Sequence, residues 1–420
     1  MANKLTLFII IISPLVLAFS VIWGYVTYLA KNIFYRSNLN IVQKELVFND
    51  DVNLISKKGV LRYAGWAKNP YNLLLNIQDP SYRYTLNSLI HKLRFKQWET
   101  FTFTSNDYIF MIHIYDFMYI GGYSINVISN ISNRTEEDMN EYEKDFFSFF
   151  GKPIINYNCY KNCTQTLYSK PNNLYFSYNK TFHNNHKLEL DFEDKNVSLK
   201  MNINLVNKDY ADSIVSVSPI SNDKNFFVIS SKINLMVPKG VIYLDNTKIK
   251  AENFHVTYSS NSGVFPAKNR FIWANGNGYL NNGKKIGLNF GYGLQHFNKS
   301  MHTEDAFFIE GKIYKLNAVK SEPFYNSRQK TKRSNEETDE EKLEWNFYNY
   351  DNDYNDKGVN YCDVIFTPFS SSYNSFNFLM NEVKLRKFFG SFKGLCKDFN
   401  GNKYTFNNVI GVIEDKDYVW

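Results

Sequence analysis

From about residue 60 to its end, the chain alternates short apolar and aromatic runs with turn residues such as Asn, Gly, Asp and Pro. Runs rich in aromatic and β-branched side chains are typical of β-strands joined by tight turns. The clearest run covers 108–128, and 197–206 and 226–235 alternate apolar with polar positions. The pattern therefore predicts an all-β fold with many antiparallel strands, arranged as sandwiches or barrels.

Two Asn-Gly pairs, Asn282-Gly283 and Asn400-Gly401, mark the tightest turns that we expect. This dipeptide favours the two-residue turn of a β-hairpin, because both positions need a positive φ. Helical periodicity is brief along the chain. After the N-terminal segment, 137–150 is the best candidate for a helix.

The N-terminal segment is the longest apolar run. From Leu5 to Ala30 it is almost wholly apolar and uncharged, which is long enough to cross a bilayer as one helix. It predicts a single-pass membrane anchor over residues 1–31. A cleaved signal peptide, with Ala18 and Ser20 before the cut, is the alternative. The apolar residues beyond that cut favour the anchor.

Either interpretation places the main domain in the secretory lumen or outside the cell, with an organelle inner membrane as the alternative. Four cysteines and six Asn-x-Ser/Thr sequons are compatible with an oxidising compartment. The net charge of +7 is scattered, with lysines and arginines among acids. Because no basic stripe is present to bind a phosphate backbone, we expect no nucleic-acid partner.

The length of 420 residues favours two domains after the anchor. Residues 32–59 form a polar connector, and we expect β-barrel domains at 60–235 and 236–420. The segment 325–344 is highly charged and nearly free of apolar residues. It predicts a disordered insertion in the second domain.

Several short motifs occur in one order between residue 60 and the C-terminus. They are Gly65-Trp66-Ala67-Lys68-Asn69-Pro70, Lys96-Gln97-Trp98-Glu99, Asp116–Gly121, Lys232–Pro238, Trp273–Gly278, Gly287–Gly293, Gly390–Gly394, Gly411–Glu414 and the terminal Trp420. Each motif alone is weak, but together and in this order they resemble the uncharacterised domain-of-unknown-function family numbered 2804.

That resemblance implies two lipocalin-like antiparallel barrels, of the hydroxyneurosporene-synthase-like kind, and relatives that bind or transform long apolar molecules. A small barrel of this sort can hold one ligand, but a fold does not dictate a function. The chain departs from the family at 262–270, where an Asp-Trp-Gly-Arg-Gly-like stretch is expected and Ser-Gly-Val-Phe-Pro-Ala-Lys-Asn-Arg stands instead. The missing acid weighs against an inherited reaction.

Asp116 is the most conspicuous polar residue within an apolar run. On a strand it shares one face with Ile112 and Ile114. A buried carboxylate must be paired or have a raised pKa. Asp116 is therefore either a polar anchor inside a ligand cavity or a structural acid bonded to the backbone or to tyrosine hydroxyl groups.

Aromatic residues complete the predicted ligand site. Trp66, Trp98, Trp273 and Tyr292 could line an apolar cavity, since indole offers a large contact area with one donor. Plugs that fill the barrels are an equal alternative. No His or Cys spacing is typical of a metal site, so we expect neither a metal nor a cofactor.

Cys362 and Cys396 are predicted to lie close together. If 361–369 pairs antiparallel with 387–397 around a turn near 377–381, the two cysteines face each other. An oxidising compartment would then allow a disulfide between them.

Three functions remain open from the sequence. The leading one is a membrane-anchored binding protein for a lipid or another apolar small molecule. The second is a hydratase- or isomerase-type enzyme, with Asp116 or Glu414 as acid and base. The third is a structural accessory subunit of a membrane complex. Titratable groups that converge in one pocket would favour the enzyme, and an exposed aromatic patch would favour the subunit.

Overall fold

The computed structural model describes residues 45–47, 52–53, 56, 61–68, 73–74 and, with gaps, 94–419. The gaps are 118–119, 130, 132–138, 148–162, 170–173, 182–184, 196, 207–211, 221–222, 294–303, 326–342, 350–357 and 379–380. The predicted anchor (1–31) lies outside the described residues, as do most of the connector (32–59) and of the charged segment 325–344. Within the described part, no helix is long and apolar enough to cross a membrane.

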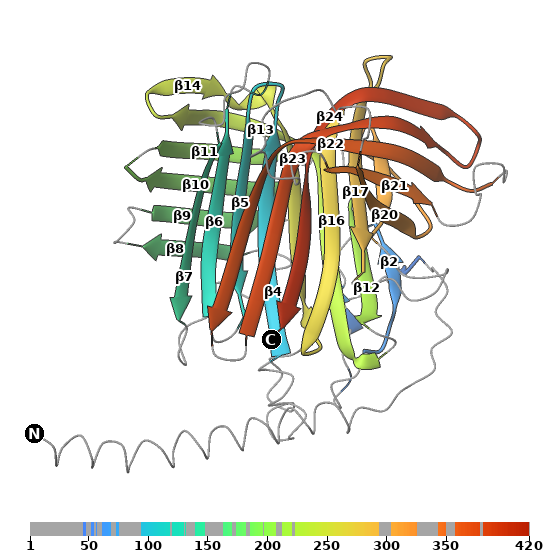
Figure 1. Ribbon diagram of the computed structural model, residues 1–420, viewed down its shortest axis with the longest axis horizontal. Helices are drawn as coiled ribbons and strands as arrows, with labels where there is room; N and C mark the ends of the chain where they lie inside the picture. Colours follow the sequence, from blue (N-terminus) through green and yellow to red (C-terminus); the bar gives the residue numbers. More distant parts are fainter. Residues whose placement is uncertain are drawn as a thin grey trace, which may run out of the picture.

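Thirteen of the described strands form one curled antiparallel sheet (Figure 1). They are β2 Gly65–Ala67, β4 Phe95–Thr104, β5 Ile109–Asp116, β6 Ile120–Ile128, β7 Met139–Phe147, β8 Cys163–Ser169, β9 Leu174–Thr181, β10 Asn185–Glu193, β11 Ser198–Val206, β12 Ile214–Ile220, β13 Asp223–Leu244, β14 Thr247–Lys250 and β15 His255–Val264. The main order is β7-β6-β5-β4-β15-β13-β11-β10-β9-β8, with β12 and β14 paired to β13, and β2 to β12.

Nine further strands form the second curled antiparallel sheet. They are β16 Lys268–Tyr279, β17 Lys285–Tyr292, β18 Ala306–Ile309, β19 Lys312–Lys315, β20 Val319–Tyr325, β21 Leu343–Asn349, β22 Tyr361–Phe378, β23 Asn381–Lys397 and β24 Lys403–Val419. Their order is β19-β18-β17-β16-β24-β23-β22-β21-β20. A short parallel pair, β1 (Val52–Asn53) with β3 (Leu73–Leu74), and a 3₁₀ turn at Ala251–Asn253 complete the described elements.

The predicted all-β class is confirmed, because the described residues form two curled antiparallel half-barrels. The predicted boundary between residues 235 and 236 falls inside β13, whereas the first sheet continues through β15 and the second begins at β16. Residues 223–232 of β13 pair with β12, and 237–244 pair with β11. A bend at Leu235, whose φ is 59°, separates these halves and interrupts the sequence pattern.

The prediction of a helix at 137–150 is wrong, because β7 occupies Met139–Phe147 and pairs antiparallel with β6. β7 is the first strand in the order of its sheet. Charged residues are common in edge strands, where they prevent pairing with other chains. In this segment the charged residues separate the apolar residues at a spacing that resembles the periodicity of a helix.

Both predicted Asn-Gly hairpins are present, but each turn is one residue longer than expected. The glycine takes a positive φ in each, 83° at Gly283 and 88° at Gly401, as in a three-residue hairpin loop. In the first loop, Leu280 N donates to Lys284 O and Gly283 N donates to Leu280 O. In the second loop, Asp398 N donates to Asn402 O and Gly401 N donates to Asp398 O.

The two sheets pack against each other through strands whose two faces belong to different hydrophobic cores. Successive residues of a strand point to opposite faces, so Phe101 and Phe103 of β4 enter the interior of the first half-barrel while Trp98 belongs to the packing between the sheets. Hydrogen bonds cross this layer, including Lys387 Nζ to Ser124 Oγ at 2.7 Å. In Figure 1, β22–β24 accordingly pass over β4–β6.

A row of glycines runs across the second sheet, because Gly276 and Gly390 are both register partners of Gly411. A Cβ atom on Gly411 would lie 2.1 Å from Asn275 O and 2.6 Å from the Phe392 ring. We therefore expect Gly411→Ala to lower the free energy of unfolding by about 1–3 kcal/mol. Urea unfolding measures this, and Asn408→Ala at an exposed position of β24 is the control. An equal midpoint for both variants would contradict the close packing.

Candidate functional site

A small cavity lies between the two sheets, and aromatic side chains form much of its wall. Trp98 comes from β4, Phe271 and Trp273 from β16, and Tyr292 from β17. The cavity volume is about 20 Å³, which is room for about one water molecule. Aromatic walls keep bulk water away, so charges inside interact more strongly than they would at the surface.

Four charged side chains line the same cavity and form two ion pairs. Lys416 Nζ lies 2.9 Å from Glu414 Oε2, both on β24, and both side chains are 1% exposed. Lys232 Nζ of β13 lies 3.6 Å from Oε2 of Glu304, which stands just before β18. Ion pairs this deeply buried are costly to desolvate, and their convergence in one cavity makes this cavity the candidate functional site.

Lys232 is held by polar groups of β15 and by an aromatic ring. Its Nζ donates to Ser259 Oγ at 2.6 Å and to Asn261 Oδ1 at 3.1 Å, and it lies 4.6 Å from the centre of the Trp273 ring. Burial lowers the pKa of Lys232 to about 8, although the Glu304 carboxylate acts in the opposite direction. The ammonium is thus the main form at neutral pH, and it loses its proton more easily than a surface lysine.

This pKa predicts a pH dependence of stability. Between about 8 and the ordinary value of 10.5, the unfolded chain binds more protons at Lys232 than the folded chain, so the free energy of unfolding rises with pH, at up to about 1.4 kcal/mol per unit. Lys232→Met should lack this contribution. Chemical unfolding of both proteins at pH 7.0–10.5 gives the difference, and parallel curves would show that Lys232 keeps an ordinary pKa.

The two carboxylate oxygens of Glu414 have different surroundings. Its Oε2 pairs with Lys416, whereas its buried Oε1 has no hydrogen-bond partner among the described residues. Lys416 Nζ also lies 5.6 Å from the Trp98 ring centre and 5.7 Å from that of Phe271. Burial lowers the pKa of Lys416, and the Glu414 carboxylate raises it in part. One carboxylate oxygen therefore remains available at a cavity of water size.

The second carboxylate, Glu304, is positioned by the neighbouring strands. Ser230 Oγ donates to its Oε2. A Cβ atom on Gly291 would lie 2.8 Å from its Oε1, so the glycine leaves room for the carboxylate. The Glu304 backbone oxygen accepts from Asn289 Nδ2 at 2.7 Å, and Asn289 Oδ1 accepts from Trp273 Nε1 at 2.8 Å. Ser230 thus holds the Glu304 carboxylate. Asn289 links the Glu304 backbone to the Trp273 side chain.

Three of the residues predicted for ligand binding, Trp98, Trp273 and Tyr292, meet at this cavity. Trp66 does not line it. The Trp66 side chain is half-buried against a separate cluster around Phe308 and Ile313, because β2 pairs with β12 at the side of the first sheet. Glu414, expected as a possible acid or base, does line the cavity.

Asp116 does not line the cavity either. It ends β5 opposite Gln97 and Gly121, is 1% exposed, and shares its strand face with Ile112 and Ile114, which belong to the core inside the first half-barrel. Burial and the charge of Arg94 hold the pKa of the nearby buried Lys96 well below its usual value. The Asp116 carboxylate opposes this shift in part. This placement fits the structural-acid alternative better than a ligand anchor.

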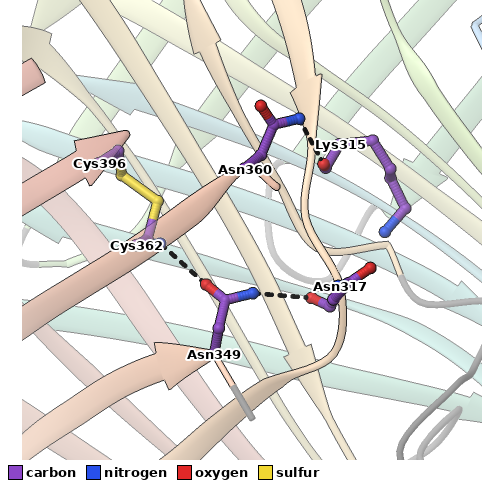
Figure 2. Close-up of a disulfide and its surroundings, with 6 residues drawn as sticks. All are labelled: Lys315, Asn317, Asn349, Asn360, Cys362 and Cys396. Carbon is purple, nitrogen blue, oxygen red and sulfur yellow. Dashed lines mark hydrogen bonds between the residues drawn. A yellow bond between two sulfur atoms is a disulfide. The ribbon is translucent and has the colours of Figure 1, made fainter. Parts of the chain in front are cut away.

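Cys362 and Cys396 are register partners on β22 and β23 and form a disulfide, with their Cα atoms 4.1 Å apart. Figure 2 shows the bond beside Asn349, whose Oδ1 accepts from Cys362 N at 2.8 Å. Cys159 lies outside the described residues. Within the described residues, no group of three or more His, Cys, Asp or Glu side chains is arranged to hold a metal ion.

The fold and the cavity define an all-β protein of two packed half-barrels with buried ion pairs between them. Residues 44–420 match the family described as "Domain of unknown function (DUF2804)", and the chain belongs to this family. The resemblance found in the short motifs is thereby confirmed. No curated protein matches the sequence.

Several solved structures are similar to this chain at low sequence identity. They include a protein assigned as AttH from Nitrosomonas europaea, with 9% identity, 77% of this chain and 92% of that chain covered, and a TM-score of 0.42. CghA with Sch210972 has 9% identity, coverages of 77% and 88%, and a TM-score of 0.39. Kievitone hydratase from Nectria haematococca has 11% identity, coverages of 77% and 88%, and a TM-score of 0.38.

Proposed function

We propose that the protein is an acid–base enzyme that adds water to, or isomerises, a small apolar molecule that binds beside the water-sized cavity between its sheets. One observation carries the proposal: Glu414 lines a cavity of water size, and its buried Oε1 accepts no hydrogen bond among the described residues. A carboxylate in this position can take a proton from water and return it to carbon. The aromatic wall supplies contact with an apolar substrate.

The other residues of the cavity have separate roles in this proposal. Lys416 holds Oε2 of Glu414 and thereby directs Oε1 toward the cavity. Lys232 and Glu304 form the second pair, and Lys232 offers positive charge to a substrate oxygen. Trp98 and Trp273 contact the apolar part of the substrate and limit the access of bulk water.

The cavity favours this enzyme over a lipid carrier. The volume between the sheets, about 20 Å³, suits a reacting water molecule beside the Glu414 carboxylate. The buried charge pairs in its wall are also unlike the mostly apolar lining of a pocket that only holds an apolar ligand. We retain membrane anchoring through residues 1–31 as part of the proposal. The substrate would then reach the cavity from a membrane, where apolar molecules accumulate.

The test uses the full-length protein in detergent with an apolar extract of its source cells, in water labelled with heavy oxygen. Mass spectrometry should find a compound that gains one labelled water, or one that is isomerised and exchanges hydrogen when the solvent is deuterated. Heat-denatured protein is the control. If an unchanged compound copurifies in equal amount with the protein and no product forms, the carrier is correct and the enzyme is rejected.

A further inference from the structure

Asn275 of β16 is a fully buried residue whose side-chain amide has no partner among the residues that the structure describes. The residue is 0% exposed, and neither its Nδ2 nor its Oδ1 makes a hydrogen bond there. Buried polar groups in folded proteins are almost always bonded to protein or to ordered water, because an unsatisfied group loses its hydration without compensation. The amide of Asn275 is therefore available to a small polar ligand.

The polar neighbours of Asn275 on the same face of the sheet are bonded to other groups. Its register partner on β17 is Asn289, which accepts from Trp273 Nε1 at 2.8 Å and donates to Glu304 O at 2.7 Å. Asn277, two residues along β16, donates to a threonine of β15 at 2.7 Å. Asn275 and Asn289 thus lie side by side and are equally buried, but only the amide of Asn289 is satisfied.

Glu414 is the diagonal neighbour of Asn275 on the adjacent strand. In the antiparallel pair of β16 and β24, Trp273 lies opposite Glu414 and Asn275 lies opposite Val412, so these four side chains share one face. Diagonal neighbours lie about 7–8 Å apart, within reach of long side chains. Glu414 Oε1 is also buried without a hydrogen-bond partner in the described part of the chain. One small molecule between the two side chains would satisfy both.

The hydrogen-bonding capacity of the two oxygens identifies this molecule. A carboxylate oxygen and the Oδ1 atom of an asparagine only accept hydrogen bonds. A molecule that is bonded to Glu414 Oε1 and to Asn275 Oδ1 must donate two hydrogens, which water can do and a substrate hydroxyl group cannot. Asn275 does not line the cavity itself, but it follows Trp273, which does, and the cavity has room for about one water molecule.

We infer that Asn275 and Glu414 together hold the water molecule that reacts, at the Trp273 end of the cavity. The inference rests on the proposed function and restricts it to hydration, because an isomerisation consumes no water. With one hydrogen bonded to Glu414 Oε1 and the other to Asn275 Oδ1, the lone pairs of the water molecule are directed to the substrate. Asn275 is thus a positioning residue for the nucleophile.

The step balances in atoms and electrons. The water oxygen bonds to one carbon of a double bond while the proton on the Glu414 side passes to Oε1. The hydrogen on the Asn275 side stays on the oxygen and becomes part of the product hydroxyl group. The π electrons move to the other carbon, which takes the proton back from the Glu414 carboxylic acid. One water molecule is added in total, and no oxidant or reductant is required.

A crystal structure of the full-length protein in detergent, at a resolution that shows ordered water, tests the binding of this molecule. We expect one water oxygen within about 3 Å of both Glu414 Oε1 and the Asn275 amide oxygen. Asn275→Leu keeps a similar volume without a hydrogen-bonding group, and its crystals should lack this water. A water bonded to only one of the two residues, or no water at this place, would overturn the inference. If Asn275→Leu does not fold, the wild-type crystals still decide the question.

Kinetics test whether the bound water is the one that reacts. With the compound found to be hydrated in the cell extract, Asn275→Leu should lower kcat per folded protein by at least about tenfold. KM should change little, because the amide contacts water and not the substrate. Val412→Ala is the matched control, since Val412 is fully buried and is the register partner of Asn275 on β24, and it should keep its kcat. An equal loss in both variants would attribute the effect to packing and overturn the inference.

The outcomes separate this inference from the proposed function. A bridging water without any product from the extract would reject the enzyme and leave a buried water of structural importance only. Conversely, product formation in a protein without the bridging water would retain the enzyme and reject the role of Asn275. A reaction found to be isomerisation alone would also retain the enzyme and overturn the inference.

Discussion

Glu414→Gln is expected to lower the rate of the proposed reaction by about 10²–10⁴-fold, the largest effect of any single substitution that we predict. The amide keeps the shape of the side chain but can neither accept nor return a proton. It also leaves the buried Lys416, normally 2.9 Å from Glu414 Oε2, without its anionic partner, so some loss of stability accompanies the loss of activity. Product formation per folded protein measures the effect, with circular dichroism as the check on folding.

Glu304→Gln is the matched comparison, because Glu304 is also buried in an ion pair at the same cavity. Its Oε2 already accepts from Ser230, which leaves it less free to exchange a proton with substrate. We expect its loss of activity to be at least tenfold smaller than that of Glu414→Gln. A folded Glu414→Gln protein with the wild-type rate would remove Glu414 from the chemistry.

The fold was predictable wherever local pattern and local pairing agree. Apolar alternation and the Asn-Gly turns gave the all-β class and the hairpins, and the register of Cys362 with Cys396 followed from the position of one turn. The division of β13 was not predictable, because its two halves pair with β12 and β11, which are separate strands. A strand with one partner on each side of a bend has no distinct signature in sequence.

The candidate site was predictable for its aromatic residues and not for its lysines. Lys232 lies in an alternating Ser-Ser-Lys-Ile-Asn run, which has the pattern of a strand with one face in water. In the structure, that polar face packs against the polar face of a second sheet. Lys416 likewise stands in a charged Glu-Asp-Lys-Asp run that is typical of an exposed end. Burial of two polar faces against each other depends on the packing of distant strands.

The second large effect concerns the disulfide between Cys362 and Cys396, whose sequence separation is 34 residues. Replacing both cysteines by alanine releases this loop in the unfolded chain, which should cost about 3–4 kcal/mol of unfolding free energy. Both cysteines are fully buried, and Cys362 N donates to Asn349 Oδ1, so truncation adds a small cavity beside an ordered strand pair. The midpoint of guanidinium unfolding, measured with and without a reducing agent, gives the effect.

Val364→Ala separates the cost of truncation from the cost of releasing the loop. Val364 is fully buried on β22, two residues after Cys362, so its truncation leaves a similar cavity without opening a covalent loop. We expect this variant to lose less stability than the double alanine variant and to respond to reducing agent as the wild-type protein does. The double variant should not respond to reducing agent at this bond. A double variant as stable as Val364→Ala would mean that the bond adds only packing, because the unfolded chain already keeps β22 and β23 together.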